Sequence, residues 1–156
     1  MEETITGRLR LSYFTVKKIV DGDDSREVKL QKICEMLKEE VSYFDWVGFY
    51  LVDKSGKNLV LGPYSGKPTE HKKIPFGKGV CGQVAQKKKT MVVQDISQET
   101  NYLSCSLDVK SEAAVPIIKD LNFVGALDVD SNEEAPFKRD DVAYLEDICH
   151  LVEKLF

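Results

Sequence analysis

The four cysteines are the residues of this chain best suited to redox chemistry, and their surroundings differ. Cys34 and Cys149 fall on apolar stripes with helical spacing, where a free cysteine is usually a small packed hydrophobic residue. Cys105 lies in the polar run NYLSCSLD, which has neither helix nor strand periodicity. Cys81 lies in GVCG, at the start of a predicted helix, whose N-terminus stabilises a thiolate and lowers its pKa. We therefore expect thiol chemistry at Cys105 and Cys81 rather than at the other two.

The residues alone leave alternatives open for both candidates. Cys105 is either an exposed surface cysteine or a reactive thiol, and Cys81 is either a small residue in a tight glycine turn or a redox residue. The chain has no CxxC motif and no cysteine and histidine cluster. We therefore expect four free thiols in a reducing compartment and no metal site; the thiol reaction implied below needs no cofactor either.

Three acids and two aromatics are candidates for a binding site opposite the cysteines. Side chains alternate along a strand, so Trp46 and Tyr50 share one face, and so do Asp128 and Asp130. Glu112 opens a neighbouring strand and could join the two aspartates. Grouped carboxylates raise one another's pKa, which allows a neutral acid to donate a proton. Taken alone, these residues favour a simpler interpretation, in which the aspartates bind turn amides and the aromatics are half-buried core residues.

The elements that must position these residues follow from hydrophobic periodicity. A first helix is predicted over 9–20, and a second follows from about residue 24, with Asp24 and Glu27 forming a capping box. Apolar residues in KRDDVAYLEDICHLVEKLF predict a closing helix, and FGKGVCGQVAQKKK predicts a glycine turn into a short one. Five or more β-branched or aromatic runs lie between. This order predicts an α+β fold, an antiparallel sheet with helices on one face.

Length and composition set limits on the class of protein. A chain of 156 residues with 42% hydrophobic residues is expected to form one domain over 1–156. The net charge of -4 gives no reason to expect nucleic acid or a membrane as partner. No spanning segment or signal peptide is found, so we expect a cytoplasmic protein. His71, in the basic loop TEHKKIP, is expected to be exposed.

Five stretches in this order resemble a known family: WVGFYLVD, LVLGPYSGK, IPFGKGVCGQVA, SEAAVPI and GALDVDS. Together with a cysteine shortly before SE, they resemble the free methionine-(R)-sulfoxide reductases, which are built on a GAF domain. The resemblance implies a six-stranded antiparallel sheet with helices on one face, the ligand pocket on the other, and a homodimer. It implies that Cys105 is the nucleophile. It implies that three acids hold the substrate: Glu112, Asp128 and Asp130. It also implies that Trp46 and Tyr50 form the pocket wall around the methyl group of the substrate.

The chain departs from the family pattern at two places. Members often carry a resolving cysteine after GK, whereas no cysteine occurs here between Lys67 and Ile74, and Ser106 replaces the acid that commonly follows the nucleophile. Regeneration of the Cys105 thiol must then differ from the family pattern or depend on Cys81. The implied reaction gives a sulfenic acid on Cys105 and then a disulfide, which thioredoxin or a similar dithiol reduces.

A GAF domain that only binds and senses a small molecule is the competing interpretation. Such a sensor normally passes its signal to an attached output domain, and 156 residues leave no room for one. A sensor that acts through a separate chain remains open.

Overall fold

A six-stranded antiparallel sheet organises the part of the chain that the computed structural model describes, residues 2–103 and 107–156, with side chains from residue 10 onward. The strands lie in the order β3-β2-β1-β6-β5-β4. Their bounds are β1 (Trp46–Val52), β2 (Asn58–Ser65), β3 (Lys73–Pro75), β4 (Met91–Val93), β5 (Ser111–Lys119) and β6 (Asn122–Ser131). The four longer strands β2, β1, β6 and β5 lie between the short edge strands β3 and β4, and the predicted α+β class is confirmed.

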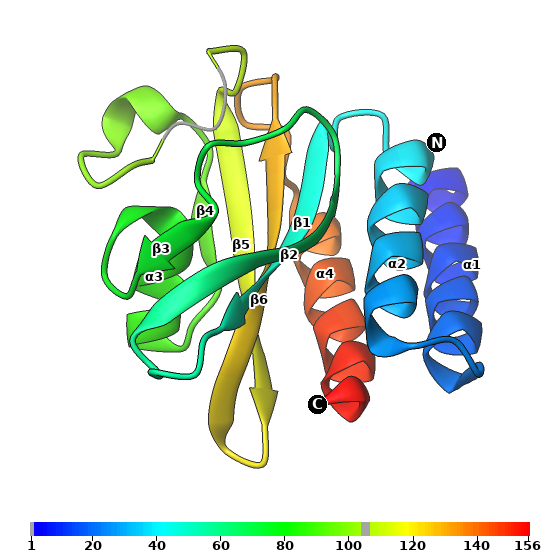
Figure 1. Cartoon of the computed structure of the whole chain (residues 1–156). Helices are drawn as coiled ribbons and strands as arrows, with labels where there is room; N and C mark the ends of the chain where they lie inside the picture. Colours follow the sequence, from blue (N-terminus) through cyan, green and yellow to red (C-terminus); the bar gives the residue numbers. More distant parts are fainter. Residues whose placement is uncertain (1, 104–106) are drawn as a thin grey trace.

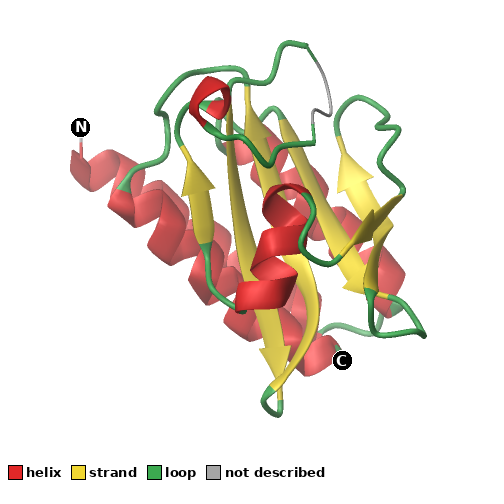
Figure 2. Cartoon of the chain, turned by 90° about the vertical axis from the view of Figure 1, so that its left-hand side faces the viewer, coloured by secondary structure: helices red, strands yellow, loops and turns green. Residues whose placement is uncertain are grey.

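Helices cover the two faces of the sheet unequally. Three of them, α1 (Glu2–Asp21), α2 (Arg26–Glu40) and α4 (Arg139–Val152), lie side by side on one face (Figure 1). The short helix α3 (Gly79–Lys87) lies on the opposite face, in front of the strands in Figure 2. Two 3-10 turns complete the elements, η1 (Ile96–Gln98) and η2 (Glu153–Leu155). The face that carries α3 is therefore the one left for a site.

The alternation along β1 divides the core as the sequence predicts. Val47 and Phe49 are buried against α1, α2 and α4, whereas Trp46 and Tyr50 are buried on the α3 side. Cys34 and Cys149 belong to the helix-side core, and burial raises the pKa of both thiols well above its ordinary range. The prediction that these two are core cysteines is confirmed.

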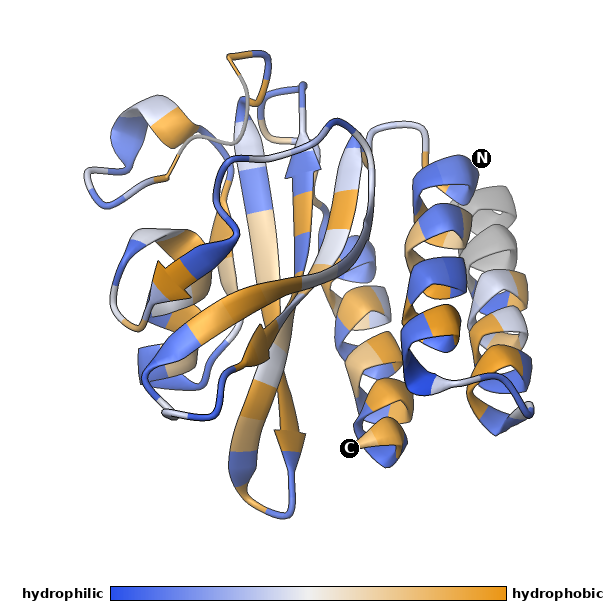
Figure 3. Ribbon diagram, viewed as in Figure 1, coloured by the Kyte–Doolittle hydropathy of each residue, from blue (hydrophilic) through white to orange (hydrophobic). Residues whose placement is uncertain are grey.

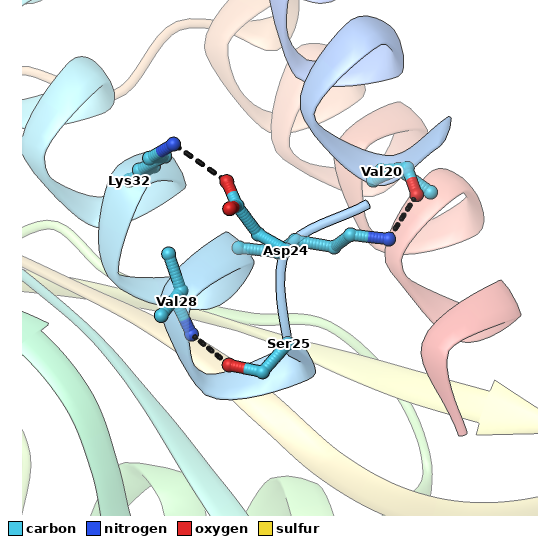
Figure 4. A network of polar contacts seen from close by, with 6 residues as sticks. Val20, Asp24, Ser25, Val28 and Lys32 are labelled. Carbon is cyan, nitrogen blue, oxygen red and sulfur yellow. Dashed lines mark hydrogen bonds and ion pairs between the residues drawn. The ribbon is translucent and has the colours of Figure 1, made fainter. Parts of the chain in front are cut away.

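The start of α2 differs from the predicted capping box, as Figure 4 shows. Ser25 is the N-cap, and its hydroxyl accepts a hydrogen bond of 3.3 Å from the backbone N–H of Val28. Asp24 instead pairs with Lys32 at 2.6 Å. The Ser25 hydroxyl lies one residue closer to the helix than the predicted Asp24 carboxylate, so it reaches a backbone N–H of the first helical turn. The first helix also begins earlier than predicted, at Glu2.

Hydrophilic bands mark the beginning of β5 and the end of β6 (Figure 3). The pairing of the strands places Glu112 opposite Asp130, and Ala114 opposite Asp128. The beginning of β5 and the end of β6 lie at the same end of the sheet because the two strands are antiparallel neighbours, so residues from separate strands meet there. No helix in the described part of the chain has the length and apolar character needed to cross a bilayer.

Candidate functional site

Three buried carboxyl groups gather where β5 begins and β6 ends. Glu112 and Asp130 are register partners, and Asp128 lies two residues before Asp130 on the same face of β6. Burial raises the pKa of Asp128 to about 6, and hydrogen bonds from Glu112 and Cys81 oppose this rise. Two carboxyl groups share a hydrogen bond only when one carries a proton. The predicted acid cluster is thus present, with a proton held within it.

Helix α3 places Cys81 against this cluster. Its thiol donates a hydrogen bond to Asp128, and its sulfur lies within 4.8 Å of carboxyl oxygens of Asp128 and Glu112. Burial, and then the charges of Asp128, Glu112 and Asp130, raise the pKa of Cys81 well above its ordinary value. The expected lowering by the helix N-terminus is wrong, because a partial dipole charge is outweighed by desolvation and three carboxyl groups.

The two predicted aromatics pack together beside the acids. Trp46 stacks on Tyr50 with ring centroids 6.2 Å apart, and on Tyr64 at 5.5 Å. The Trp46 Nε1–H donates to the carbonyl oxygen of Lys67, and the Tyr50 hydroxyl donates to that of His71, both at 2.9 Å. The rings therefore hold the loop that follows β2 over this face of the sheet.

Two glycines make room for the Trp46 ring. A Cβ atom at Gly48 would lie 2.3 Å from Cη2 of Trp46, and one at Gly66 would lie 2.6 Å from its Cδ1. Gly66 also has a φ of +134°, which side chains disfavour. Sequence reasoning missed both residues, since a glycine inside a strand, such as Gly48, or just after one, such as Gly66, does not name the group that approaches it.

The predicted substrate residues line two separate cavities. A cavity of about 510 Å³ is lined by Trp46 and Asp130, together with the exposed Lys67–Asp108 ion pair of 3.1 Å. A second cavity measures about 10 Å³ and holds about one water molecule. Its lining includes Tyr50, His71, Cys81, Leu103, Glu112 and Asp128.

The small cavity favours positive charge. Its lining brings Glu112 and Asp128 together, and the lining residues that the structure describes include no lysine or arginine. His71 lies there half-buried, although its basic loop predicted exposure. His71 is less exposed than predicted because the Tyr50 hydroxyl donates to its backbone carbonyl oxygen and holds the loop against the sheet.

Cys105, the predicted nucleophile, lies in the segment 104–106, outside the described residues. The residues before it are anchored to the turn that precedes α3. Asn101 Oδ1 accepts from the backbone N–H of Gly79, and its Nδ2 donates to the carbonyl oxygen of Gly77, both at 2.8 Å. Leu103 follows and lines the small cavity. Sequence reasoning missed Asn101, since a polar residue in a polar run carries no signal of its own.

Known proteins share this fold and much of this sequence. Residues 25–155 match the GAF domain family. "GAF domain-containing protein A" of Dictyostelium discoideum is 37% identical over 88% of this chain and 85% of its own length. A free methionine-R-sulfoxide reductase of Saccharomyces cerevisiae is 33% identical over 98% of this chain and 86% of its own.

A solved structure extends this similarity to three dimensions. The X-ray structure of free methionine-R-sulfoxide reductase from Neisseria meningitidis in complex with its substrate is 36% identical to this chain. It superposes with a TM-score of 0.89 over 95% of this chain and 87% of that chain. The chain therefore belongs to the GAF domain family and, within it, to the free methionine-(R)-sulfoxide reductases.

Proposed function

We propose that this protein reduces free methionine-(R)-sulfoxide to methionine, with Cys105 as the nucleophile. The observation that carries the proposal is the group of buried carboxyl groups beside stacked aromatic rings, in a chain similar to reductases of this substrate. A carboxylate among Glu112, Asp128 and Asp130 pairs with the substrate ammonium. A residue inside a peptide has no ammonium group, so peptide-bound methionine sulfoxide is a poor substrate.

The first chemical step transfers oxygen from the substrate to the enzyme. The Cys105 sulfur attacks the sulfoxide sulfur and forms a transient sulfur–sulfur bond. The oxygen is then protonated and passes to the Cys105 sulfur while the substrate's sulfur–oxygen bond and the transient sulfur–sulfur bond break, so methionine leaves and Cys105 becomes a sulfenic acid. The oxygen needs a proton as it leaves, and we assign this role to the acid cluster, in which Glu112 and Asp128 share a proton. Trp46 and Tyr50 form the apolar wall for the methyl group.

Cys81 is the proposed resolving cysteine. Its thiol condenses with the sulfenic acid of Cys105, which releases water and forms a disulfide. One observation supports this step: Leu103, two residues before Cys105, lines the same cavity as Cys81. An external dithiol such as thioredoxin then restores both thiols, so the reaction requires no metal or organic cofactor.

Peptide mapping by mass spectrometry after one equivalent of substrate tests the role of Cys81. We expect a Cys81–Cys105 disulfide in the unmutated protein, and one stoichiometric reduction without recycling in Cys81→Ser. A stable sulfenic acid on Cys105 with Cys81 still reduced would mean that the external reductant resolves Cys105 directly.

The small cavity must enlarge for the substrate to bind. An amino acid is far larger than the single water molecule that about 10 Å³ can hold. Trp46, which lines the cavity of about 510 Å³, stacks on Tyr50, which lines the small cavity. We therefore place the substrate across the two cavities, so that all five predicted binding residues contact it.

The protein is proposed to act as a homodimer in the cytoplasm. Leu11 and Phe14 are exposed on α1, and an apolar groove of about 430 Å³ lies between α1 and α4. Such a surface is typical of an interface between subunits. Sedimentation velocity tests this assignment: the unmutated protein should sediment as a dimer and Phe14→Glu as a monomer, and a monomeric unmutated protein would contradict it.

A thioredoxin-coupled assay with purified protein tests the function. The account expects reductant consumption with free methionine-(R)-sulfoxide, and rates lower by at least about a hundredfold with the same residue inside a peptide. Equal rates on both substrates would refute the proposed specificity. Tight binding of the free amino acid without turnover would instead support a GAF sensor.

A further inference from the structure

The cluster of Cys81, Glu112 and Asp128 has the composition of a metal site. Each of these buried residues offers one ligand atom, and the three atoms lie within 4.8 Å of one another. Zinc binds thiolate sulfur at about 2.3 Å and carboxylate oxygen at about 2.0–2.2 Å, so three such ligands end about 3.5 Å apart. Small rotations of these side chains therefore bring all three atoms onto one ion.

A second observation points to a ligand at this place. The carboxyl group of Asp128 hydrogen-bonds to Cys81 and Glu112, yet its Oδ1 is fully buried and has no hydrogen-bond partner among the described residues. A buried oxygen of this kind costs free energy unless a donor or a cation satisfies it. This oxygen belongs to the same carboxyl group that supplies a ligand atom to the cluster.

The size and lining of the small cavity match a single cation. Its volume of about 10 Å³ accommodates one water molecule or one bare ion, and its lining residues include no lysine or arginine in the part of the chain described. Thiol and carboxyl groups, two of the ligand types that zinc takes in proteins, therefore lie around one space. The thiol distinguishes this site from magnesium and calcium sites, which are built from oxygen.

We propose that Cys81, Glu112 and Asp128 bind one Zn²⁺ ion or another thiophilic divalent cation, and that the bound ion excludes the substrate. The Cys81 proton passes to solvent as the metal–sulfur bond forms, and no oxidation takes place. Exclusion of substrate rests on the proposed function, because both carboxyl groups are there assigned to the substrate. Binding of the ion does not rest on it.

Metal binding is measured directly on the reduced full-length protein without substrate. Titration with Cd²⁺ gives thiolate-to-metal charge-transfer absorption, and calorimetric titration with Zn²⁺ gives the affinity. We expect one ion per chain, and affinity at least about tenfold weaker in Cys81→Ser, Asp128→Asn and Glu112→Gln. Cys149→Ala removes another buried thiol and should bind as the unmutated protein does. Circular dichroism verifies that each variant is folded.

Several outcomes overturn the inference. These are no stoichiometric binding, unchanged affinity in Asp128→Asn and Glu112→Gln, or loss of the cadmium absorption in Cys105→Ala but not in Cys81→Ser. The reductase assay distinguishes this failure from failure of the proposed function. Zn²⁺ should inhibit competitively with methionine sulfoxide, and a chelator should restore the activity; a protein that binds zinc but never reduces the sulfoxide would refute only the function.

Discussion

Asp128 joins the acid cluster to the thiol of Cys81, so single substitutions here test the chemistry most sharply. We expect Glu112→Gln, Asp128→Asn and Asp130→Asn each to lower kcat/KM for free methionine-(R)-sulfoxide at least about tenfold, equivalent to about 1.4 kcal/mol. The amide keeps the shape but loses the charge that pairs with the ammonium.

Asp120→Asn is the matched control for these amides. Asp120 lies in the β5–β6 turn, so the same replacement of a carboxyl group by an amide is made outside the acid cluster. Its φ of 49° also suits asparagine. Its kcat/KM should equal that of the unmutated protein. Full activity in all three cluster variants would show that the carboxyl groups do not hold the substrate.

The proton held at Asp128 also makes stability depend on pH. Burial raises the pKa of Asp128 from 3.8 to about 6, so the folded state binds more protons than the unfolded state between these values. The free energy of unfolding therefore falls as pH rises through this window. Because Glu112 shares the proton, the midpoint belongs to the pair.

Urea unfolding of the unmutated protein and Asp128→Asn, with a chelator present, measures this effect. The free energy of unfolding of the unmutated protein minus that of the variant should decline from about pH 4 to about pH 7, since asparagine has no charge to desolvate. A difference that stays constant or rises with pH would contradict a raised pKa at Asp128.

Single residues were predictable where one periodicity decides their place. The strict alternation of strands placed Trp46 with Tyr50 and Asp128 with Asp130 on shared faces, as the structure shows. The pKa of Cys81 was not predictable in this way. The direction of its shift depends on burial and on carboxyl groups from β5 and β6, which the fold brings next to Cys81 from distant parts of the sequence.

At the scale of elements, the loop before Cys105 is fixed to the turn before α3 through Asn101. Asn101→Ala removes two hydrogen bonds of 2.8 Å, so we expect the free energy of unfolding to fall by about 1–2 kcal/mol. We also expect kcat/KM to fall about tenfold, because the residues that precede the nucleophile lose their anchor.

Asn58→Ala is the control for this prediction, since Asn58 Nδ2 donates to Asp53 and Ser55 in the β1–β2 turn, away from both cavities. It should lower stability and leave kcat/KM unchanged. Equal kcat/KM for the two variants would show that Asn101 serves stability alone.

Elements with strong periodicity were correctly predicted, and their ends were not. The glycine turn into α3 and the strands around it followed from local sequence. The first turn of α2 was assigned to the wrong cap, because Asp24 and Ser25 are both good caps and only the tertiary pairing of Asp24 with Lys32 decides between them. Cavity shape was beyond sequence reasoning, since it depends on how the Trp46 ring packs against Gly48 and Gly66.

For the whole molecule, we propose that residues 1–156 fold as one domain. Trp46 is the single tryptophan and reports on the α3 side of the sheet, whereas far-ultraviolet circular dichroism reports mainly on α1, α2 and α4. Both signals should therefore change with the same midpoint in guanidinium chloride. Two separated midpoints would show that the two faces unfold independently.

The most direct test of the account is a single turnover without any external reductant. Reduced protein is mixed with excess free methionine-(R)-sulfoxide, and methionine formed per chain is counted in the unmutated protein and in Cys105→Ser. The account predicts about one methionine per chain in the unmutated protein, and none in Cys105→Ser, because each turnover consumes the Cys105 thiol. Undiminished methionine formation by Cys105→Ser would contradict it.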